Sequence, residues 1–367
     1  MEKGKKKLIL FMPSIDGGGV EKNLIIISNY LSKKIEDIVL ITFDSKFNNN
    51  FNKNIKIINV INNQKKKYSK YYKYFKCLLL LYSEIRKKNS LVFAFQANIY
   101  CCMMSLIFGF KLITRSNSSP SGWSKNFLKN VIFNILLKVP KKIIVNSIYF
   151  KREIDRKFNI KSVIIYNPFN LKEVIKLSKK KINISFFKNS HIKAINVARF
   201  TDQKDHITLL KSILILKKRN IKIKLLILGY GPNKIKMLNF IKNNQLNDYV
   251  KIINFKKNPF KYIAQSDLFL LTSTYEGLPN VLLEAMCLKK FIISSDCPTG
   301  PREILKNGKL GMLFPCKKEE ILAKKITEYI SYKKKYNKLT LEAYKSLDRF
   351  DYTLNCQKYL KAVIKFI

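Results

Sequence analysis

The chain has few of the residues that mark several common classes of protein. It contains 7 cysteines, an odd number without a Cys-x-x-Cys pair, and only 2 histidines among 367 residues. It has no Asp-x-Asp triplet and no group of His, Cys and Asp residues at the spacing of metal ligands. We therefore expect reduced thiols in a cytosolic protein, no disulfide framework, no bound metal and no other cofactor.

Acidic residues are also scarce, because 24 Asp and Glu residues accompany 71 Lys and Arg residues, giving a formal net charge of +47. Such a charge attracts polyanions, and both nucleic acid and an anionic membrane are candidates. The basic residues are spread along the whole chain, with no zinc-finger spacing and no aromatic RNA-binding signature, which argues against nucleic acid. We expect a cytoplasmic protein that lies peripherally on the inner face of the cell membrane.

Two segments bear on this membrane expectation. Residues 65–88 mix lysines, tyrosines and leucines, as in a basic amphipathic helix at a lipid surface or a crossover helix of an α/β domain, and both descriptions can hold together. Residues 89–110 form a charge-poor run, but Gln96 and Asn98 interrupt it and favour a strand, a turn and a helix over a membrane span. Residues Lys3 to Lys7, four of them lysine, lead directly into the first predicted strand, so no signal peptide is expected.

The hydrophobic pattern predicts two α/β domains. Short apolar runs alternate with helical patterns over roughly the first 166 residues, which is typical of parallel strands joined by crossover helices. The pattern weakens through Lys-rich residues 167–191, interpreted as a linker with a short helix, and then restarts. We predict a domain at 1–170, a second at 190–344, and a closing helix within 345–367 that packs back on the first domain.

The carboxyl ends of the predicted strands gather the unusual residues. In open parallel sheets, ligands bind outside these ends. Arg199, Glu276 and Asp296 each follow a predicted strand of the second domain. The predicted strands are residues 7–12, 37–43, 90–95, 111–115 and 142–147 in the first domain, and 193–198, 224–229, 251–255, 267–273 and 291–296 in the second.

Glycine is rare enough to be informative, since the chain has only 12. Most of these follow a predicted strand and precede a predicted helix, where a residue without Cβ lets the backbone approach a ligand closely. We therefore interpret them as markers of a site. The glycines concerned are Gly17, Gly18, Gly19, Gly229, Gly231, Gly277, Gly300, Gly308 and Gly311.

Residues 274–286 carry the most specific signal. Glu276 and Glu284 flank a Gly-Leu-Pro turn and the start of an apolar helix. Pro279 suits the first helical position, and the N–H groups of the helix start would point toward an anion. The helix is apolar nearly all round, so we expect Glu284 to be largely buried and to need hydroxyl or N–H partners. A sugar nucleotide offers such groups.

These motifs resemble those of retaining nucleotide-sugar glycosyltransferases of the GT-B fold, in the group marked by two glutamates eight positions apart. The resemblance covers about residues 8 to 345 and implies two Rossmann-like doubly wound domains facing across a cleft. A further segment, SSDCPTGPREIL, is similar to members that build bacterial surface polysaccharides and lipid-linked oligosaccharides. The motifs that carry the resemblance are GGGVEKN, VARFTDQKDHITLL, LLILGYGP and YEGLPNVLLEAM.

The resemblance assigns a role to each site residue. Arg199 and Lys204 would hold the donor diphosphate and neutralise the charge that grows on the leaving group. Glu276 would contact hydroxyls of the donor sugar, and Glu284 would accept hydrogen bonds from the ribose. Arg199, Lys204 and Glu276 are the candidate catalytic residues. The remaining candidate substrate-binding residues are Gly17, Gly18, Gly19, Gly229, Gly231, Gly277, Leu278, Pro279 and Asn280.

One departure concerns histidine. Related enzymes often carry a histidine in the first domain, whereas His191 and His206 fall in the linker and the second domain. Arg115, Ser116 and Asn117 could contact the sugar or acceptor instead, or could simply end a strand. We interpret His206 as a residue that packs or caps a helix start.

The resemblance implies transfer of a glycosyl group from a nucleotide-diphosphate donor, by family frequency a UDP-sugar, to a hydroxyl of a lipid-linked or cell-surface glycan with retention of configuration. The departing phosphate would take the acceptor proton, so no protein base is required. Two alternatives stay open. One is a soluble glycosyltransferase for a small-molecule or storage glycan, and the other is a non-catalytic basic protein that binds membranes or nucleic acid on the same scaffold.

Overall fold

The computed structural model describes residues 7–15, 19–61, 68–87, 89–116, 127–188 and 190–367. The chain divides into two compact units. The first comprises Met1–Pro168 with Tyr352–Ile367, and the second comprises Phe169–Asp351. The domains predicted from the sequence were 1–170 and 190–344, with a closing helix within 345–367.

The first unit is built on a parallel sheet that has seven strands in the described part of the chain. The fully buried strand β1 lies in the interior of the sheet, next to the middle strand β4, where a continuous apolar run is expected. Chain order reverses between β1 and β4, so the carboxyl ends of these two strands flank a topological switch point. The spatial order is β3 (Ile55–Ile61), β2 (Ile38–Asp44), β1 (Lys7–Phe11), β4 (Ser90–Ala94), β5 (Lys111–Ser116), β6 (Lys142–Val145) and β7 (Val163–Ile164).

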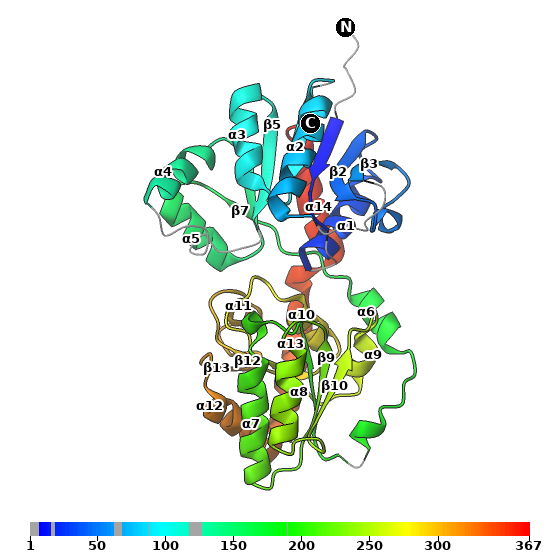
Figure 1. Cartoon of the computed structure of the whole chain (residues 1–367), viewed down its shortest axis with the longest axis vertical. Helices are drawn as coiled ribbons and strands as arrows, with labels where there is room; N and C mark the ends of the chain where they lie inside the picture. The colour runs from blue at the N-terminus through cyan, green and yellow to red at the C-terminus, as the bar shows by residue number, and fades with distance from the viewer. Residues whose placement is uncertain (1–6, 16–18, 62–67, 88, 117–126, 189) are drawn as a thin grey trace. The chain divides into compact units, whose positions relative to one another are not determined.

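Helices cover both faces of this sheet (Figure 1). α1 (Gly19–Leu31) and α14 (Tyr352–Ile364) pack on one face, and Tyr359 and Val363 of α14 belong to that core. α2 (Lys70–Ile85), α3 (Asn98–Phe108) and α4 (Phe127–Leu136) contribute to the core on the other face. α5 (Ile148–Phe158) packs against β6. The closing helix therefore belongs to the first unit.

The second unit repeats this plan with a parallel sheet of six strands in its described residues. Chain order reverses between β8 and β11, which sets a second switch point. The spatial order is β10 (Val250–Asn254), β9 (Lys224–Gly229), β8 (Lys193–Val197), β11 (Leu268–Leu271), β12 (Phe291–Ser295) and β13 (Met312–Phe314).

The helices of the second unit include a pair, α7 and α8, that lie side by side in Figure 1. Residues 167–191 are not only a linker, because α6 packs against α9 and α10 and so forms part of this unit. The helices are α6 (Leu171–Ser178), α7 (His206–Lys218), α8 (Lys234–Asn243), α9 (Phe260–Ala264), α10 (Asn280–Cys287), α11 (Gly300–Ile304), α12 (Glu319–Ser331) and α13 (Lys333–Lys345).

Three predictions can be compared directly with these elements. The ten predicted strands are confirmed, while β3, β7 and β13 were not among them. The charge-poor run at 89–110 is the expected strand, turn and helix, and in the described part of the chain no helix has the length and apolar character needed to cross a bilayer. All seven cysteines are free, and six of them are buried, as expected for cysteines that pack in the core.

Candidate functional site

The switch point of the second sheet brings two chain segments together. One follows β8 and contains Arg199 and Lys204, and the other follows β11 and contains Glu276. β8 and β11 are hydrogen-bonded neighbours, so the segments leave the sheet side by side at its carboxyl edge. The chain thus places three separately predicted residues at one edge of one unit.

Lys204 and Glu276 form the central contact of this site. Lys204 Nζ lies 2.5 Å from Glu276 Oε1, and the two side chains are only 14% and 8% exposed. The hydroxyl of Ser273 donates to the same carboxylate oxygen at 2.6 Å. In the described part of the chain Oε2 of Glu276 has no hydrogen-bond partner. A carboxylate with one oxygen fixed and the other open can accept hydrogen bonds from a ligand's hydroxyl groups.

Arg199 differs from Lys204 in its surroundings. Its side chain is exposed, and within the residues that the structure describes no acceptor pairs with its guanidinium group. The backbone around it is fixed by the bond from Phe200 N to Tyr230 O, at 2.7 Å, and from Ala198 N to Leu228 O, at 3.0 Å. Arg199 is therefore a cation on a fixed backbone that can reach a ligand without breaking a protein contact.

The glycines beside Arg199 have a packing role. A Cβ on Gly229 would lie 1.8 Å from the carbonyl oxygen of Ala198, and a Cβ on Gly231 would lie 2.5 Å from that of Phe200. The sequence analysis attributed these glycines to close approach of a ligand. The structure gives a different requirement, since they let the loop after β9 pack against the backbone that carries Arg199.

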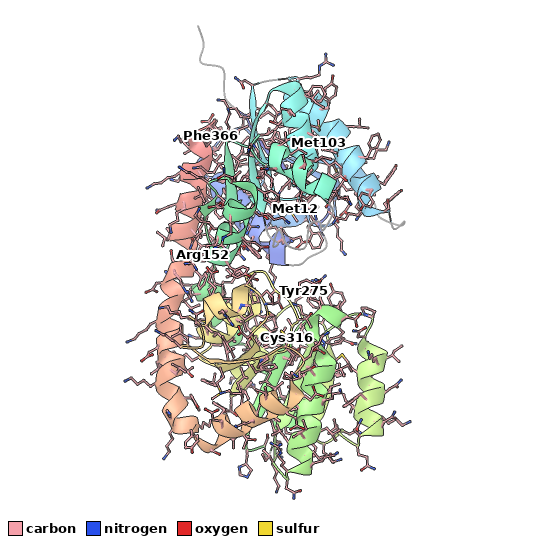
Figure 2. All side chains as sticks on the ribbon, turned by 90° about the vertical axis from the view of Figure 1, so that its left-hand side faces the viewer. Met12, Met103, Arg152, Tyr275, Cys316 and Phe366 are labelled. Atoms are coloured by element: carbon pink, nitrogen blue, oxygen red, sulfur yellow. The ribbon has the colours of Figure 1, made fainter. Side chains whose placement is uncertain are left out.

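The segment after β11 is tied to the Lys204 segment by several hydrogen bonds. The Thr272 hydroxyl donates to Lys204 O at 2.9 Å, Thr274 N donates to Gln203 O at 2.8 Å, and Gln203 Nε2 donates to Tyr275 O at 2.9 Å. Tyr275 lies at the same end of the unit as Cys316 (Figure 2), whose Sγ contacts the carbonyl of Ser273. These bonds hold the two segments in register independently of the Lys204–Glu276 pair.

The turn between the two glutamates rests on residues 299 and 300. The Thr299 hydroxyl donates to Glu276 O, and Thr299 has a positive φ of 92°, a strained conformation of the kind found at functional sites. A Cβ on Gly300 would lie 1.7 Å from the carbonyl oxygen of Gly277. Sequence reasoning did not find Thr299, because nothing in a lone threonine reports a contact across 23 residues.

Helix α10 begins at Asn280 and not at Pro279 as predicted. Pro279 occupies the N-cap position with φ −72° and ψ 107°. Because this ψ is extended and not helical, Pro279 precedes the helix by one residue. Leu278 and Glu284 are both buried, and Glu284 is 6% exposed, as expected for a carboxylate inside an apolar helix. Leu282 N in the first turn of α10 donates to Pro279 O at 3.1 Å. The N-terminus of α10, where the helix dipole is positive, follows Glu276 and Gly277 after a few residues.

His206 is the first residue of α7 and is buried. Its Nε2 lies 3.2 Å from Asn196 Oδ1, and its ring packs edge-on against Phe200. Burial, with a smaller contribution from the Lys204 charge, lowers the pKa of His206 from 6.5 to about 4. The interpretation of His206 as a helix-start packing residue fits this geometry.

This buried imidazole predicts acid sensitivity. Between pH 6.5 and about 4, the imidazole of His206 is protonated in the unfolded protein and stays neutral in the folded protein. Its contribution to the free energy of unfolding is therefore complete above pH 6.5 and is lost as the pH falls toward about 4. The free energy of unfolding should decrease by about 2 kcal/mol between neutral pH and about pH 5 from this group alone. Urea unfolding at both pH values measures it. The decrease should be smaller in His206→Gln and unchanged in His191→Gln, whose histidine is exposed; equal pH dependence in His206→Gln and wild type would contradict the prediction.

The candidate residues of the first unit are described only in part. Gly17, Gly18 and Asn117 lie outside the described residues, and Gly19 is the first residue of α1. Arg115 is fully buried and donates to Tyr359 Oη at 2.9 Å and to Asn167 Oδ1 at 2.5 Å. It therefore joins β5 to α14, and it also lines a cavity of about 400 Å³ at the carboxyl ends of β4 and β5.

Comparisons with known proteins agree with this architecture. Residues 177–346 match the family model described as glycosyl transferases group 1. The chain is 27% identical, over 97% of its length and 99% of the relative, to N-acetylgalactosamine-N,N'-diacetylbacillosaminyl-diphospho-undecaprenol 4-alpha-N-acetylgalactosaminyltransferase of Campylobacter jejuni. It is 33% identical to the uncharacterized glycosyltransferase MJ1059 of Methanocaldococcus jannaschii, where the match covers 53% of this chain and spans about half (50%) of the relative.

The solved structures show the fold. The chain is similar to Alr3699/HepE of Anabaena, solved in complex with UDP and glucose, with a TM-score of 0.80 at 18% identity over 98% of this chain and 99% of that chain. The two parallel-sheet, Rossmann-like units of this chain therefore match structures of the GT-B class.

Proposed function

We propose that this chain, a glycosyltransferase with the GT-B fold, transfers a sugar from a UDP-sugar to a hydroxyl group of a lipid-linked or cell-surface glycan, with retention of anomeric configuration. The observation that carries the proposal is the cluster at the second switch point. There Lys204 contacts Glu276, and the exposed cation Arg199 follows the same strand as Lys204. These are the charges that a diphosphate and a sugar hydroxyl require.

Two comparisons support the choice of substrates. Alr3699/HepE, which shares the fold, was solved with UDP and glucose, which favours a uridine nucleotide over the alternatives. The Campylobacter relative, matched along nearly its whole length, is named for a sugar acceptor on diphospho-undecaprenol. A polyprenyl-diphosphate acceptor is anchored in a membrane, and binding beside an anionic membrane would also account for the net charge of +47.

In the proposed reaction Arg199 and Lys204 bind the diphosphate and stabilise the negative charge that develops as the glycosidic bond breaks. Glu276 accepts hydrogen bonds from sugar hydroxyls through Oε2, and Glu284 accepts them from the ribose. The leaving phosphate would take the acceptor proton, and the positions of the two histidines support this. His206 is buried in packing contacts, and His191 precedes β8, at the end of that strand opposite to Arg199 and Lys204.

We propose that the reaction needs no metal ion. In the described part of the chain no three His, Cys, Asp or Glu side chains gather as metal ligands. The cationic side chains of Arg199 and Lys204 would balance the diphosphate charge instead.

Nucleotide binding tests the proposal. Purified protein should bind UDP, in preference to GDP and ADP, with an affinity that EDTA does not change. Replacing Glu284 with Ala removes the ribose acceptor, and replacing it with Gln leaves only the weaker, neutral amide oxygen, so the donor KM should rise roughly 10- to 100-fold, with a smaller change in kcat. Calorimetry and donor titrations at saturating acceptor give both quantities.

Glu342→Ala is the matched control, because Glu342 is an exposed carboxylate on α13. It should bind UDP as the wild type does. Absence of nucleotide binding by folded wild-type protein would overturn the proposed function, and unchanged binding in both Glu284 variants would overturn the role of Glu284.

A further inference from the structure

The outer side of α2, α3 and α4 exposes large apolar side chains. Each helix buries one face against the sheet, through residues such as Cys77, Cys101 and Leu136. Each also presents large apolar residues to solvent, which are between 49% and 70% exposed. We refer to the following six residues as the apolar surface: Phe75 and Leu79 of α2, Leu106 and Ile107 of α3, and Ile132 and Ile135 of α4.

α3 shows how unusual this surface is. Its eleven residues include no charged side chain, although Met103, Leu106, Ile107 and Phe108 are all exposed. A helix on the surface of a soluble domain normally carries polar residues on its outer face. Contiguous exposed apolar surface marks an interaction site. The outer face of a helix that is apolar on both faces is therefore suited to contact a second apolar surface.

The apolar residues of the three helices form one surface. α2 touches α3 through the ring pairs Tyr74–Tyr100 and Tyr82–Phe108, whose centroids are 5.9 Å and 4.8 Å apart. α3 in turn contacts α4. The three helices cover the same face of the first sheet and follow one another across it in Figure 1. Their outward side chains are therefore neighbours.

The charges around this surface have a single sign. Between Asp44 and Glu153 the sequence has one acidic residue, Glu84. Glu84 is buried and is paired with Lys7 and Lys87, so its charge is already compensated. Burial raises the pKa of the Glu84 carboxyl, but the hydrogen-bonded ion pairs with Lys7 and Lys87 together outweigh it and hold that pKa below its usual value.

Cationic side chains lie beside the apolar residues and next to tyrosine rings, an arrangement typical of protein surfaces at lipid headgroups. Lys76 Nζ lies 5.8 Å from the centre of the Tyr72 ring, and the Arg86 guanidinium lies 5.6 Å from that of Tyr82. Exposed Lys129 and Lys138 flank the apolar residues of α4. Lysine, arginine and tyrosine with apolar stems and polar tips are suited to the zone between acyl chains and water.

We propose that the apolar surface and its rim of cations dock the first unit onto an anionic lipid bilayer. The apolar side chains enter the boundary between headgroups and acyl chains, and the cations bind lipid phosphates. Nucleic acid would use the cations and leave six large apolar side chains in water. Since none of the described helices is long and apolar enough to span a bilayer, the contact is peripheral.

This inference goes beyond the proposed reaction, because transfer of a sugar to a hydroxyl group does not by itself require a lipid-binding surface. It is also independent of the donor chemistry, since all of its residues lie in the first unit while the donor residues lie in the second. Failure of nucleotide binding and failure of lipid binding are therefore separate outcomes.

Vesicle flotation with the full-length protein tests the proposal. The wild type should float with vesicles of phosphatidylcholine mixed with phosphatidylglycerol and much less with phosphatidylcholine alone. The double variant Ile107→Ser/Ile132→Ser should lower the partition coefficient roughly 100-fold, about tenfold for each aliphatic side chain removed. Lys129→Gln and Lys138→Gln should each lower it roughly fivefold at low salt.

Ile235→Ser is the matched control, because Ile235 on α8 of the second unit is 71% exposed and Ile107 is 70% exposed. This variant should float as the wild type does. A cooperative thermal unfolding transition at the wild-type temperature would show that the first unit of the double variant is folded. The proposal is overturned if the double variant floats like the wild type, if flotation is insensitive to anionic lipid, or if the same side chains instead hold together a dimer in the absence of lipid.

Discussion

Replacing Arg199 with alanine is expected to lower kcat by roughly 100- to 1,000-fold, or about 2.7 to 4 kcal/mol of transition-state stabilisation. Arg199 is exposed, and the described part of the chain offers its guanidinium no acceptor, so the substitution breaks no native contact. The melting temperature should stay close to that of the wild type. Initial rates at saturating donor, with thermal unfolding in parallel, measure both effects.

The reason for so large an effect is that Arg199 would contact charge that grows during the reaction. An interaction that strengthens in the transition state lowers kcat when it is removed, whereas a uniform binding contact changes only KM. Arg199→Lys keeps the charge without the bidentate geometry and should recover part of the rate. Wild-type turnover by Arg199→Ala at saturating donor would remove Arg199 from the catalytic residues.

Arg219→Ala provides the control for this experiment. Arg219 follows α7 at the opposite end of that helix from His206, and it makes a surface ion pair with Glu320 at 3.2 Å. Exposed pairs of this kind contribute between 0 and about 1 kcal/mol to stability. The variant should therefore keep wild-type kcat while losing one positive charge.

The sequence predicts the centre of each sheet better than its borders. β11 is fully buried and entirely apolar, and β1 is fully buried with four apolar residues after Lys7, so both stand out in the sequence as continuous apolar runs. β3 lies at the border of the first sheet and is mostly half-buried, with Asn59 and Lys56 among its apolar residues. β7 and β13 have only two and three residues, too few for a periodic pattern.

The site was predictable where chemistry is local and not where it depends on packing. A carboxylate within an apolar helix identifies Glu284 as buried from its neighbours alone. The contact between Lys204 and Glu276 spans 72 residues, and the bond from Thr299 to Glu276 spans 23. Such contacts arise only once the strand order is set. The requirement for glycine at position 229 likewise depends on a packing contact, because its backbone lies against the carbonyl oxygen of Ala198.

The interpretation of Arg115 shows the same limit. A cation at the end of a predicted strand is compatible with ligand binding or with an ordinary strand exit. The structure adds a third arrangement, a fully buried guanidinium held by Tyr359 from the far end of the chain. A residue separated by 244 positions leaves no local sequence signal.

Replacing Glu276 is expected to affect both turnover and stability, for separable reasons. Glu276→Gln should lower kcat by roughly 100- to 1,000-fold, because a neutral amide accepts sugar hydroxyls less strongly than a carboxylate. It should also lower the free energy of unfolding by as much as about 3 kcal/mol, since it leaves Lys204, only 14% exposed, without its counter-charge.

The double variant Lys204→Met/Glu276→Gln separates these two effects. Removing both members of a mostly buried ion pair is often close to neutral for stability, so the double variant should unfold near the wild-type temperature. Its kcat should be at least as low as that of Glu276→Gln, because it also lacks the Lys204 cation that is proposed to bind the diphosphate. If stability recovers while kcat does not, the low kcat of Glu276→Gln is not a consequence of its lower stability. If kcat recovers together with stability, neither Lys204 nor Glu276 acts on the substrate.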